Sequence, residues 1–121
     1  MTNNHKHIGK PIKHDSGHLH VTGSARYTDD LPEPKDTLYA AIGLSQHAHA
    51  TIRHIDLSKV EQAEGVVAVI TAADIPGANN LGGPAKDEPV LATDKVEYIG
   101  QSIFAVAATS VDAARRAARW R

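Results

Sequence analysis

The fold is most constrained by the stretch 38–77, LYAAIGLSQHAHATIRHIDLSKVEQAEGVVAVITAADIPG. Residues 38–44 form an apolar run that is long enough for a strand and too short for a stable helix. Residues 49–57 alternate loosely, which predicts a strand with one buried side or one near a sheet edge. Residues 66–70, VVAVI, are apolar throughout, as is typical of a strand that is covered on both faces.

The segment between the second and third of these runs carries helix signals. Ser58 is a candidate N-cap because its hydroxyl can accept from exposed backbone N–H groups, and Glu61 follows three residues later, as in a capping box. Gly65 can adopt the left-handed conformation that ends such a turn. Strand, crossover helix and buried strand together suggest a βαβ-like unit, although this crossover is short for a parallel pair.

The chain after this unit predicts a loop, two strand segments and a helix. Residues 78–93 are rich in glycine, proline and polar side chains, and we expect a loop there, with Thr71 capping a single turn through Asp74 before it. Residues 95–99 and 102–108 predict one bent strand or two, with Gly100 allowing a bulge or a close backbone approach between them.

The last helix is expected to start at its cap, Ser110, and to carry Val111, Ala114 and Ala118 on one side. It has no C-cap signal, so we expect the domain to be truncated within this helix.

The domain organisation expected from these signals is a flexible N-terminal arm, residues 1–18, followed by one domain, residues 19–121. Residues 18–21 are expected to add a short strand at the junction. The predicted class is α/β (α+β-like), a single small domain with a mixed sheet and short helices.

Composition excludes several classes of function. The 121 residues suffice for one compact domain, and 41% hydrophobic and 22% charged residues are ordinary globular values. No apolar run spans a membrane and no signal-peptide core is present, so the expectation is a cytoplasmic protein without membrane contact. The absence of cysteine excludes disulfides, Cys-ligated zinc, iron–sulfur clusters and thiol catalysis within this chain. Basic residues at both ends are too sparse, and too poor in aromatic neighbours, to indicate nucleic-acid binding.

Few residues are candidates for chemistry. Asp29 and Asp30 could form an acid–base dyad, but adjacent carboxylates ahead of prolines are more typical of a turn cap. His54 alternates with apolar residues, as a surface histidine does. Three His-x-His pairs could each place two rings on one face of a strand, and adventitious metal binding is favoured over a built site; the pairs are His5/His7, His18/His20 and His47/His49. No catalytic, cofactor-binding or metal-binding residue is therefore assigned.

Four segments carry a resemblance to a known family: HLHVTGSARYTDDLPEP, LSQHAHATIRHIDLS, EGVVAVITAADIPGANNLG and VEYIGQSIFAVAA. In the same order and with similar spacing, they resemble the start of the molybdenum-binding subunit of bacterial xanthine dehydrogenases, in the aldehyde oxidase and xanthine dehydrogenase family. The resemblance covers about residues 8–121 and implies that family's first domain, the a/b hammerhead.

The resemblance implies an oxidoreductase, a molybdenum hydroxylase of purine catabolism. Such an enzyme uses water and a molybdopterin cofactor to oxidise a purine C–H, and electrons pass through 2Fe-2S clusters and FAD to NAD. The catalytic and cofactor-contacting segments of that family lie beyond this domain, and Gln101, although it matches the family's pattern here, is not the glutamine beside molybdenum. The implied partners are the remaining domains of the molybdenum subunit and the iron–sulfur/FAD subunit.

Three functional hypotheses remain open at this point. The first is an N-terminal domain or fragment of a xanthine dehydrogenase, inactive alone, with a structural and docking role and a tendency to self-associate. The second is a stand-alone, non-catalytic interaction module with the same fold. The third, metal storage or sensing through the histidine pairs, requires tight stoichiometric metal.

Overall fold

The structure of the protein is a computed structural model that describes residues 8–85 and 87–119. Two compact units divide the chain, Met1–Pro34 and Lys35–Arg121. The first contains the helix α1 (Gly17–Val21) and the 3-10 turn η1 (Thr28–Asp30).

The predicted strand at residues 18–21 is wrong, because these residues lie in α1. The N–H groups of Leu19 and His20 both donate to the carbonyl of Ser16, as in a helical turn. Gly23, with a φ of +72°, then reverses the chain so that Ser24 and Ala25 donate back to Leu19. The segment satisfies its backbone groups locally and needs no partner strand.

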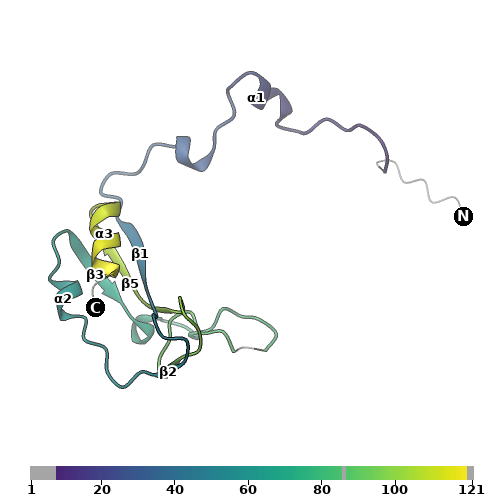
Figure 1. Cartoon of the computed structure of the whole chain (residues 1–121). Helices are drawn as coiled ribbons and strands as arrows, with labels where there is room; N and C mark the ends of the chain where they lie inside the picture. Colours follow the sequence, from purple (N-terminus) through teal and green to yellow (C-terminus); the bar gives the residue numbers. More distant parts are fainter. Residues whose placement is uncertain (1–7, 86, 120–121) are drawn as a thin grey trace, which may run out of the picture. The chain divides into compact units, whose positions relative to one another are not determined.

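A three-stranded sheet forms the centre of the second unit, with strand order β1-β5-β3 (Figure 1). β5 (Ser102–Ala108) lies in the middle and pairs antiparallel with both β1 (Tyr39–Leu44) and β3 (Val66–Ile70). The two outer strands are therefore parallel to each other, and β5 separates them. The predicted βαβ-like unit joined a strand at residues 49–57 to the strand at residues 66–70. This prediction is wrong, because the first of these strands is reduced to β2 (Ala50–Thr51), which lies in a second sheet and does not pair with β3.

The core lies between this sheet and the last helix, α3 (Val111–Ala118). The Oγ of Ser110 accepts a hydrogen bond of 3.1 Å from the N–H of Ala113, which confirms the predicted N-cap. The buried face of α3 is shifted from the predicted one, since Val111 is 42% exposed. Apart from Phe104, the side chains that fill the core from the helix and from β5 are small or medium-sized: Ala113, Ala114, Ala117, Val106 and Ala108.

The short helix α2 (Ser58–Glu61) begins one residue earlier than predicted, because Leu57 is its N-cap. The N–H of Ser58 donates to Oδ1 of Asp56 at 3.0 Å, and no side-chain cap bond forms, so the predicted capping box is wrong. Gly65 does take the predicted left-handed conformation, with a φ of +83°. A Cβ there would lie 2.9 Å from the Cβ of Ala113, so glycine also allows α3 to approach.

A second, two-stranded antiparallel sheet pairs β2 (Ala50–Thr51) with β4 (Lys95–Val96). Both strands are shorter than predicted for residues 49–57 and 95–99, and the ladder pairs only Ala50 with Val96 and Thr51 with Lys95. The turn η2 (Ala72–Asp74) is capped as predicted, since the N–H and hydroxyl of Thr71 both donate to Oδ2 of Asp74 at 2.7 and 2.8 Å.

The described part of residues 78–93 has no helix or strand, as predicted. The side-chain amide of Asn79 fixes this loop by bonding the backbone of Leu91 twice, accepting at 3.0 Å and donating at 2.7 Å.

Candidate functional site

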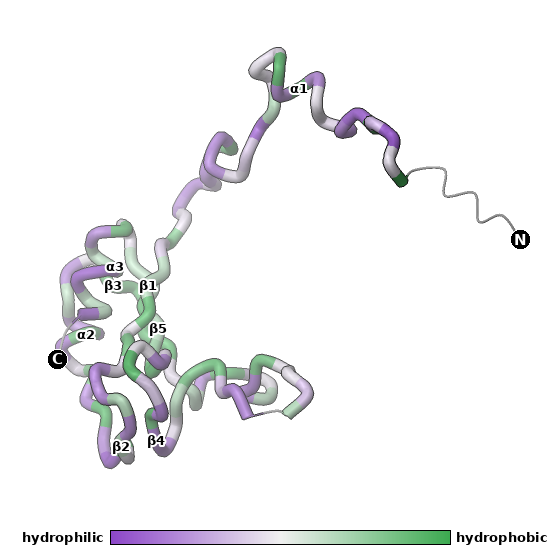
Figure 2. Tube along the Cα trace, turned by 45° about the vertical axis from the view of Figure 1, so that its right-hand side comes forward, coloured by the Kyte–Doolittle hydropathy of each residue, from purple (hydrophilic) through white to green (hydrophobic). Residues whose placement is uncertain are grey.

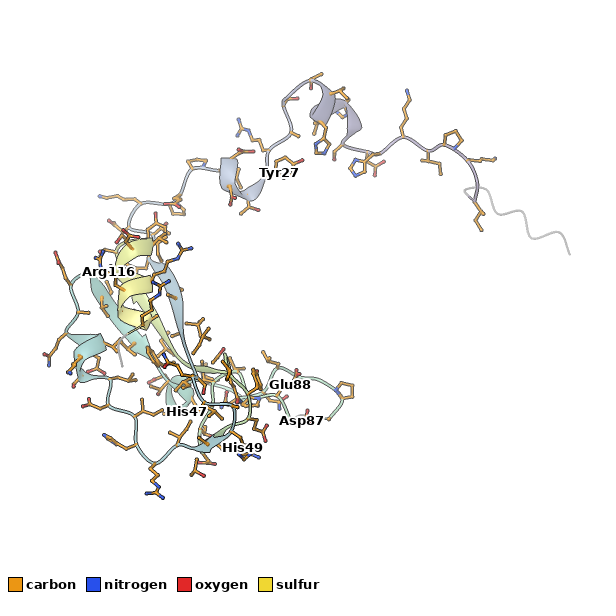
Figure 3. The ribbon with its side chains drawn as sticks, viewed as in Figure 1. Tyr27, His47, His49, Asp87, Glu88 and Arg116 are labelled. Atoms are coloured by element: carbon orange, nitrogen blue, oxygen red, sulfur yellow. The ribbon has the colours of Figure 1, made fainter. Side chains whose placement is uncertain are left out.

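Of the predicted candidate residues that the structure describes, His47 and His54 line one common groove, and no others of them are brought to it. His5 and His7 lie outside the described residues. His18 and His20 lie in α1, where a spacing of two does not place side chains on one face. His47 and His49 precede the short β2 (Figure 3) and are exposed. Among residues 8–85 and 87–119, no three His, Cys, Asp or Glu side chains are grouped so that they could hold a metal ion.

Asp29 and Asp30 lie in η1, where Oδ2 of Asp30 accepts from the N–H of Tyr27 at 2.9 Å. This is the predicted turn cap, and both carboxylates are exposed. The three tyrosines lie in different places: Tyr39 is in β1, Tyr27 caps η1, and Tyr98 is 58% exposed after β4.

The most developed concave feature is a groove of about 1290 Å3 within the second unit. One side is the end of β1 and β5 with the last turn of α3, and the other is the segment 46–57, which leaves the sheet to form β2 (Figure 1). Figure 2 shows the apolar character of β1 and β5 next to this more polar segment. The larger apolar side chains of the groove come from both sides: Ile42, Leu44, Ile52, Ile55, Ile99 and Ile103.

A hydrogen-bonded turn holds the inner end of this groove. The N–H of Ser45 donates to the carbonyl of Gln101, and the N–H of Gly100 donates to the carbonyl of Ser45, each at 2.8 Å. Gly100 has a φ of +89° and an added Cβ would meet nothing within 4 Å, so this glycine is used for its turn conformation and not for close approach. Gln101 is only 3% exposed, and its Oε1 accepts from the N–H of Glu97 at 2.6 Å. Gln101 thus has a structural role here.

The charged groups around the groove are unevenly paired. Three arginines line it, Arg53 on the segment 46–57 and Arg115 and Arg119 on α3. Asp56 is the carboxylate among the lining residues, and it accepts from Ser58, whose hydroxyl and N–H lower its pKa. The ion pairs of the described residues are Lys95–Glu97 and Arg116–Asp112, so the three guanidiniums are unpaired within that part of the chain. The groove is therefore apolar inside and basic at its edge.

The sequence contained part of the signal for this groove. The apolar positions Ile52, Ile55 and Leu57 are spaced by three and then two, which fits neither a strand nor a helix and leaves half-buried side chains on a segment without regular structure. The arginines of α3 are also what a solvated helix face carries, and a single helix does not reveal which of its sides borders a groove.

A second apolar surface is the face of the three-stranded sheet opposite α3. Paired residues on this face are Ala40 with Ala107 and Ile42 with Ala105, and Ile70 also pairs with Ala105. Ile42, which also lines the groove, is 44% exposed and Ile70 is 41% exposed, whereas the opposite face of β5 is buried by α3. Within the described residues, the sheet is thus covered on one side only.

The chain matches the family profile described as aldehyde oxidase and xanthine dehydrogenase, a/b hammerhead domain, over residues 22–120. The chain belongs to this family. The a/b hammerhead domain is 44% identical to a xanthine dehydrogenase of Oryza sativa subsp. japonica over 92% of this chain. It is 45% identical to aldehyde oxidase 2 of Rattus norvegicus over 93% of this chain. In both comparisons it spans only 8% of the relative's length.

Solved structures agree with the fold. The aldehyde oxidoreductase from Desulfovibrio desulfuricans superposes with a TM-score of 0.79 at 32% identity, over 92% of this chain and 14% of that one. A Cu,Mo-CO dehydrogenase superposes with a TM-score of 0.75 at 34% identity, over 91% of this chain and 14% of that one. The predicted small α/β domain of the a/b hammerhead type is confirmed. The relatives include both xanthine dehydrogenases and aldehyde oxidases, so the resemblance to xanthine dehydrogenase in particular is finer than the comparisons support.

The residues of this hammerhead domain do not fit the redox groups that its family implies. The chain has no cysteine thiolate to offer a 2Fe-2S cluster, and the described residues hold no cluster of metal-ligating side chains. Its groove is lined by His47, His54 and Asp56 besides apolar side chains and guanidiniums, but these three are not grouped so that they could hold a metal ion. No step of a redox reaction is therefore derived from this chain. None of the helices in the described residues has the length and apolar character needed to cross a bilayer.

Proposed function

We propose that this chain is the a/b hammerhead domain of the molybdopterin-binding subunit of a xanthine dehydrogenase, with a structural and docking role. The carrying observation is the 44% identity to a xanthine dehydrogenase over 92% of the chain. In the parent enzyme, the molybdopterin would supply the hydroxylation of xanthine or hypoxanthine, and 2Fe-2S clusters and FAD would carry electrons to NAD. These groups would be held by other parts of the molybdenum subunit and by the iron–sulfur/FAD subunit.

The docking role is supported by the two apolar surfaces of the second unit. A domain of this size buries its own core behind α3, but leaves one sheet face and one groove with half-exposed isoleucines. Contiguous exposed apolar surface on a folded domain typically marks an interaction site. Inter-domain contacts of a large enzyme would cover both surfaces.

A second candidate function, oxidation of an aldehyde, is favoured by a specific observation. Aldehyde oxidase 2 of Rattus norvegicus is as similar to this chain as the plant xanthine dehydrogenase, at 45% identity over 93% of the chain. The substrate of the parent therefore has to be tested directly. The hypothesis of a stand-alone interaction module predicts a different native mass and is tested by the same experiment.

The test is purification of the native protein with an antibody raised against this domain. Its polypeptide mass, molybdenum content and rate of NAD reduction with xanthine and with an aldehyde are then measured. A large molybdenum-containing polypeptide that reduces NAD with xanthine supports the proposal. Aldehyde oxidation without xanthine oxidation would replace it with the second candidate. A molybdenum-free protein with only the mass of this chain would establish the stand-alone module and refute the enzyme proposal.

A further inference from the structure

We infer that the groove binds an apolar protein segment flanked by carboxylates, supplied by the polypeptide that accompanies this domain in its parent enzyme. The inference rests on the proposed docking function and adds to it the chemistry of the docked segment. It concerns the groove alone and makes no claim on the open face of the sheet.

The size of the groove favours a protein segment over a small molecule. Typical small-molecule sites occupy roughly 300–1,000 Å3 and carry a few convergent polar groups that fix one orientation. This groove has about 1290 Å3, and its isoleucines and leucines come from three separate stretches of chain. Apolar side chains spread along a groove suit successive side chains of one docked segment.

The exposure of its walls indicates that residues 8–85 and 87–119 do not fill the groove. Ile99 is 68% exposed and Leu44 is 52% exposed, although each lies beside the buried turn formed by Ser45, Gly100 and Gln101. Burying both side chains would contribute about 25 cal/mol for each Å2 of apolar surface removed from water. A rigid turn that presents exposed apolar side chains loses little conformational entropy on binding.

The charge at the edge of the groove selects the flanks of the segment. Arg53 stands on one wall and Arg115 and Arg119 on the other, and none has an acidic partner within the described residues. Guanidinium groups bind carboxylates with two parallel hydrogen bonds where the geometry allows. Arginines on both walls therefore favour a segment with carboxylates on either side of its apolar centre. Charge complementarity of this kind acts mainly on specificity.

The experiment measures binding of two synthetic peptides to the isotopically labelled 121-residue chain by NMR. The peptides share one leucine–alanine centre and differ only in having glutamate or lysine flanks. We expect the glutamate peptide to bind at least about fivefold more tightly, with chemical-shift changes confined to the groove, and salt at about 0.5 M to remove most of the difference.

Matched variants separate the groove from the general charge of the chain. Arg115→Gln and Arg116→Gln remove the same charge from neighbouring positions of α3, but only Arg115 lines the groove. We expect Arg115→Gln to reduce the preference for the glutamate peptide about threefold and Arg116→Gln to leave it unchanged. Ile99→Ser should weaken both peptides equally, whereas Leu81→Ser, at 66% exposure outside the groove, should weaken neither.

Three results would overturn the inference. Equal or tighter binding of the lysine peptide would remove the charge argument. Shift changes outside the groove would place the binding elsewhere. Self-association that Ile99→Ser abolishes would assign the groove to a second copy of the chain. Each of these leaves the proposed function standing, since the mass and molybdenum content of the native protein are measured independently.

Discussion

The most informative single perturbation is Gly43→Ala, because Gly43 in β1 lies directly opposite Phe104 in β5. A Cβ built on Gly43 overlaps the Phe104 ring, and even the most distant of the three nearest ring atoms, Cδ1, is 2.6 Å away. Real Cβ atoms essentially never come closer than 3.0 Å to such an atom. The ring must therefore move, or the two strands must separate.

The cost of this movement follows from where Phe104 lies. The ring is 7% exposed and packs in the core beneath α3, so its free direction is towards the groove that it also lines. Overpacking of this kind costs about 1–3 kcal/mol. With a urea slope of about 1.5 kcal/mol/M, a loss of about 2 kcal/mol lowers the unfolding midpoint by roughly 1.3 M. Circular dichroism at increasing urea concentration measures this shift.

Two further variants test the reasoning. Gly77→Ala is the matched control, since an added Cβ there meets nothing within 4 Å, and its effect should stay within about 0.5 kcal/mol. Phe104→Leu shortens the opposing side chain, so the double variant with Gly43→Ala should be more stable than the sum of the two single losses by at least about 0.5 kcal/mol. The argument fails if Gly43→Ala is as stable as the parent, or if the two losses are additive.

Two other predictions concern single hydrogen-bonded groups. Gln101→Leu leaves the N–H of Glu97 without its acceptor, and we expect the free energy of unfolding to fall by about 1–3 kcal/mol in the same urea assay. A fall below about 0.5 kcal/mol would show that water replaces the side-chain carbonyl of Gln101 as the acceptor. The pKa of the Asp74 carboxyl is lowered mainly by the hydrogen bond from the N–H of Thr71 and secondly by the one from its hydroxyl. The carboxylate therefore stabilises the fold at pH values above the ordinary carboxyl pKa, and this stabilisation is lost as the pH falls through the lowered pKa. NMR titration should show Thr71→Val raising this pKa only part of the way back, and an unchanged value would exclude the hydroxyl as a cause.

Local signals in the sequence were sufficient to predict features that are determined by neighbouring residues. The apolar run at residues 38–44 became β1, the Ser110 cap starts α3, and Gly65 is left-handed. Each of these features depends on a few neighbouring residues whose chemistry allows one local solution. The predicted capping box at Ser58 did not form. The N–H of Ser58, which the Glu61 side chain was expected to accept, instead donates to the carboxylate of Asp56, two residues earlier.

Features that depend on distant pairing could not be predicted. The middle position of β5 is set by a segment more than thirty residues after β3 in the chain, so no local pattern shows that it separates β1 from β3. The groove depends on the same long-range arrangement, because its two walls come from the segment 46–57 and from α3. A helix carrying arginines on its exposed side is ordinary, and only the fold shows that two of them border an apolar groove.

One wrong prediction supports the proposed docking role. The VVAVI run indicated a strand covered on both faces, yet β3 is an edge strand in which Val67 is 57% exposed and Ile70 is 41% exposed. An apolar pattern reflects the total burial of a strand in its working state, whereas the structure of this chain contains only the burial that the chain provides itself. The apolar surface that the pattern expects to be buried, but that this chain leaves exposed, is available to a partner. Ile70 lies on the open face of the sheet, where Ile42 on the other outer strand is exposed to a similar degree. Both outer strands therefore carry side chains suited to a covering layer, which the remaining domains of a larger enzyme would supply.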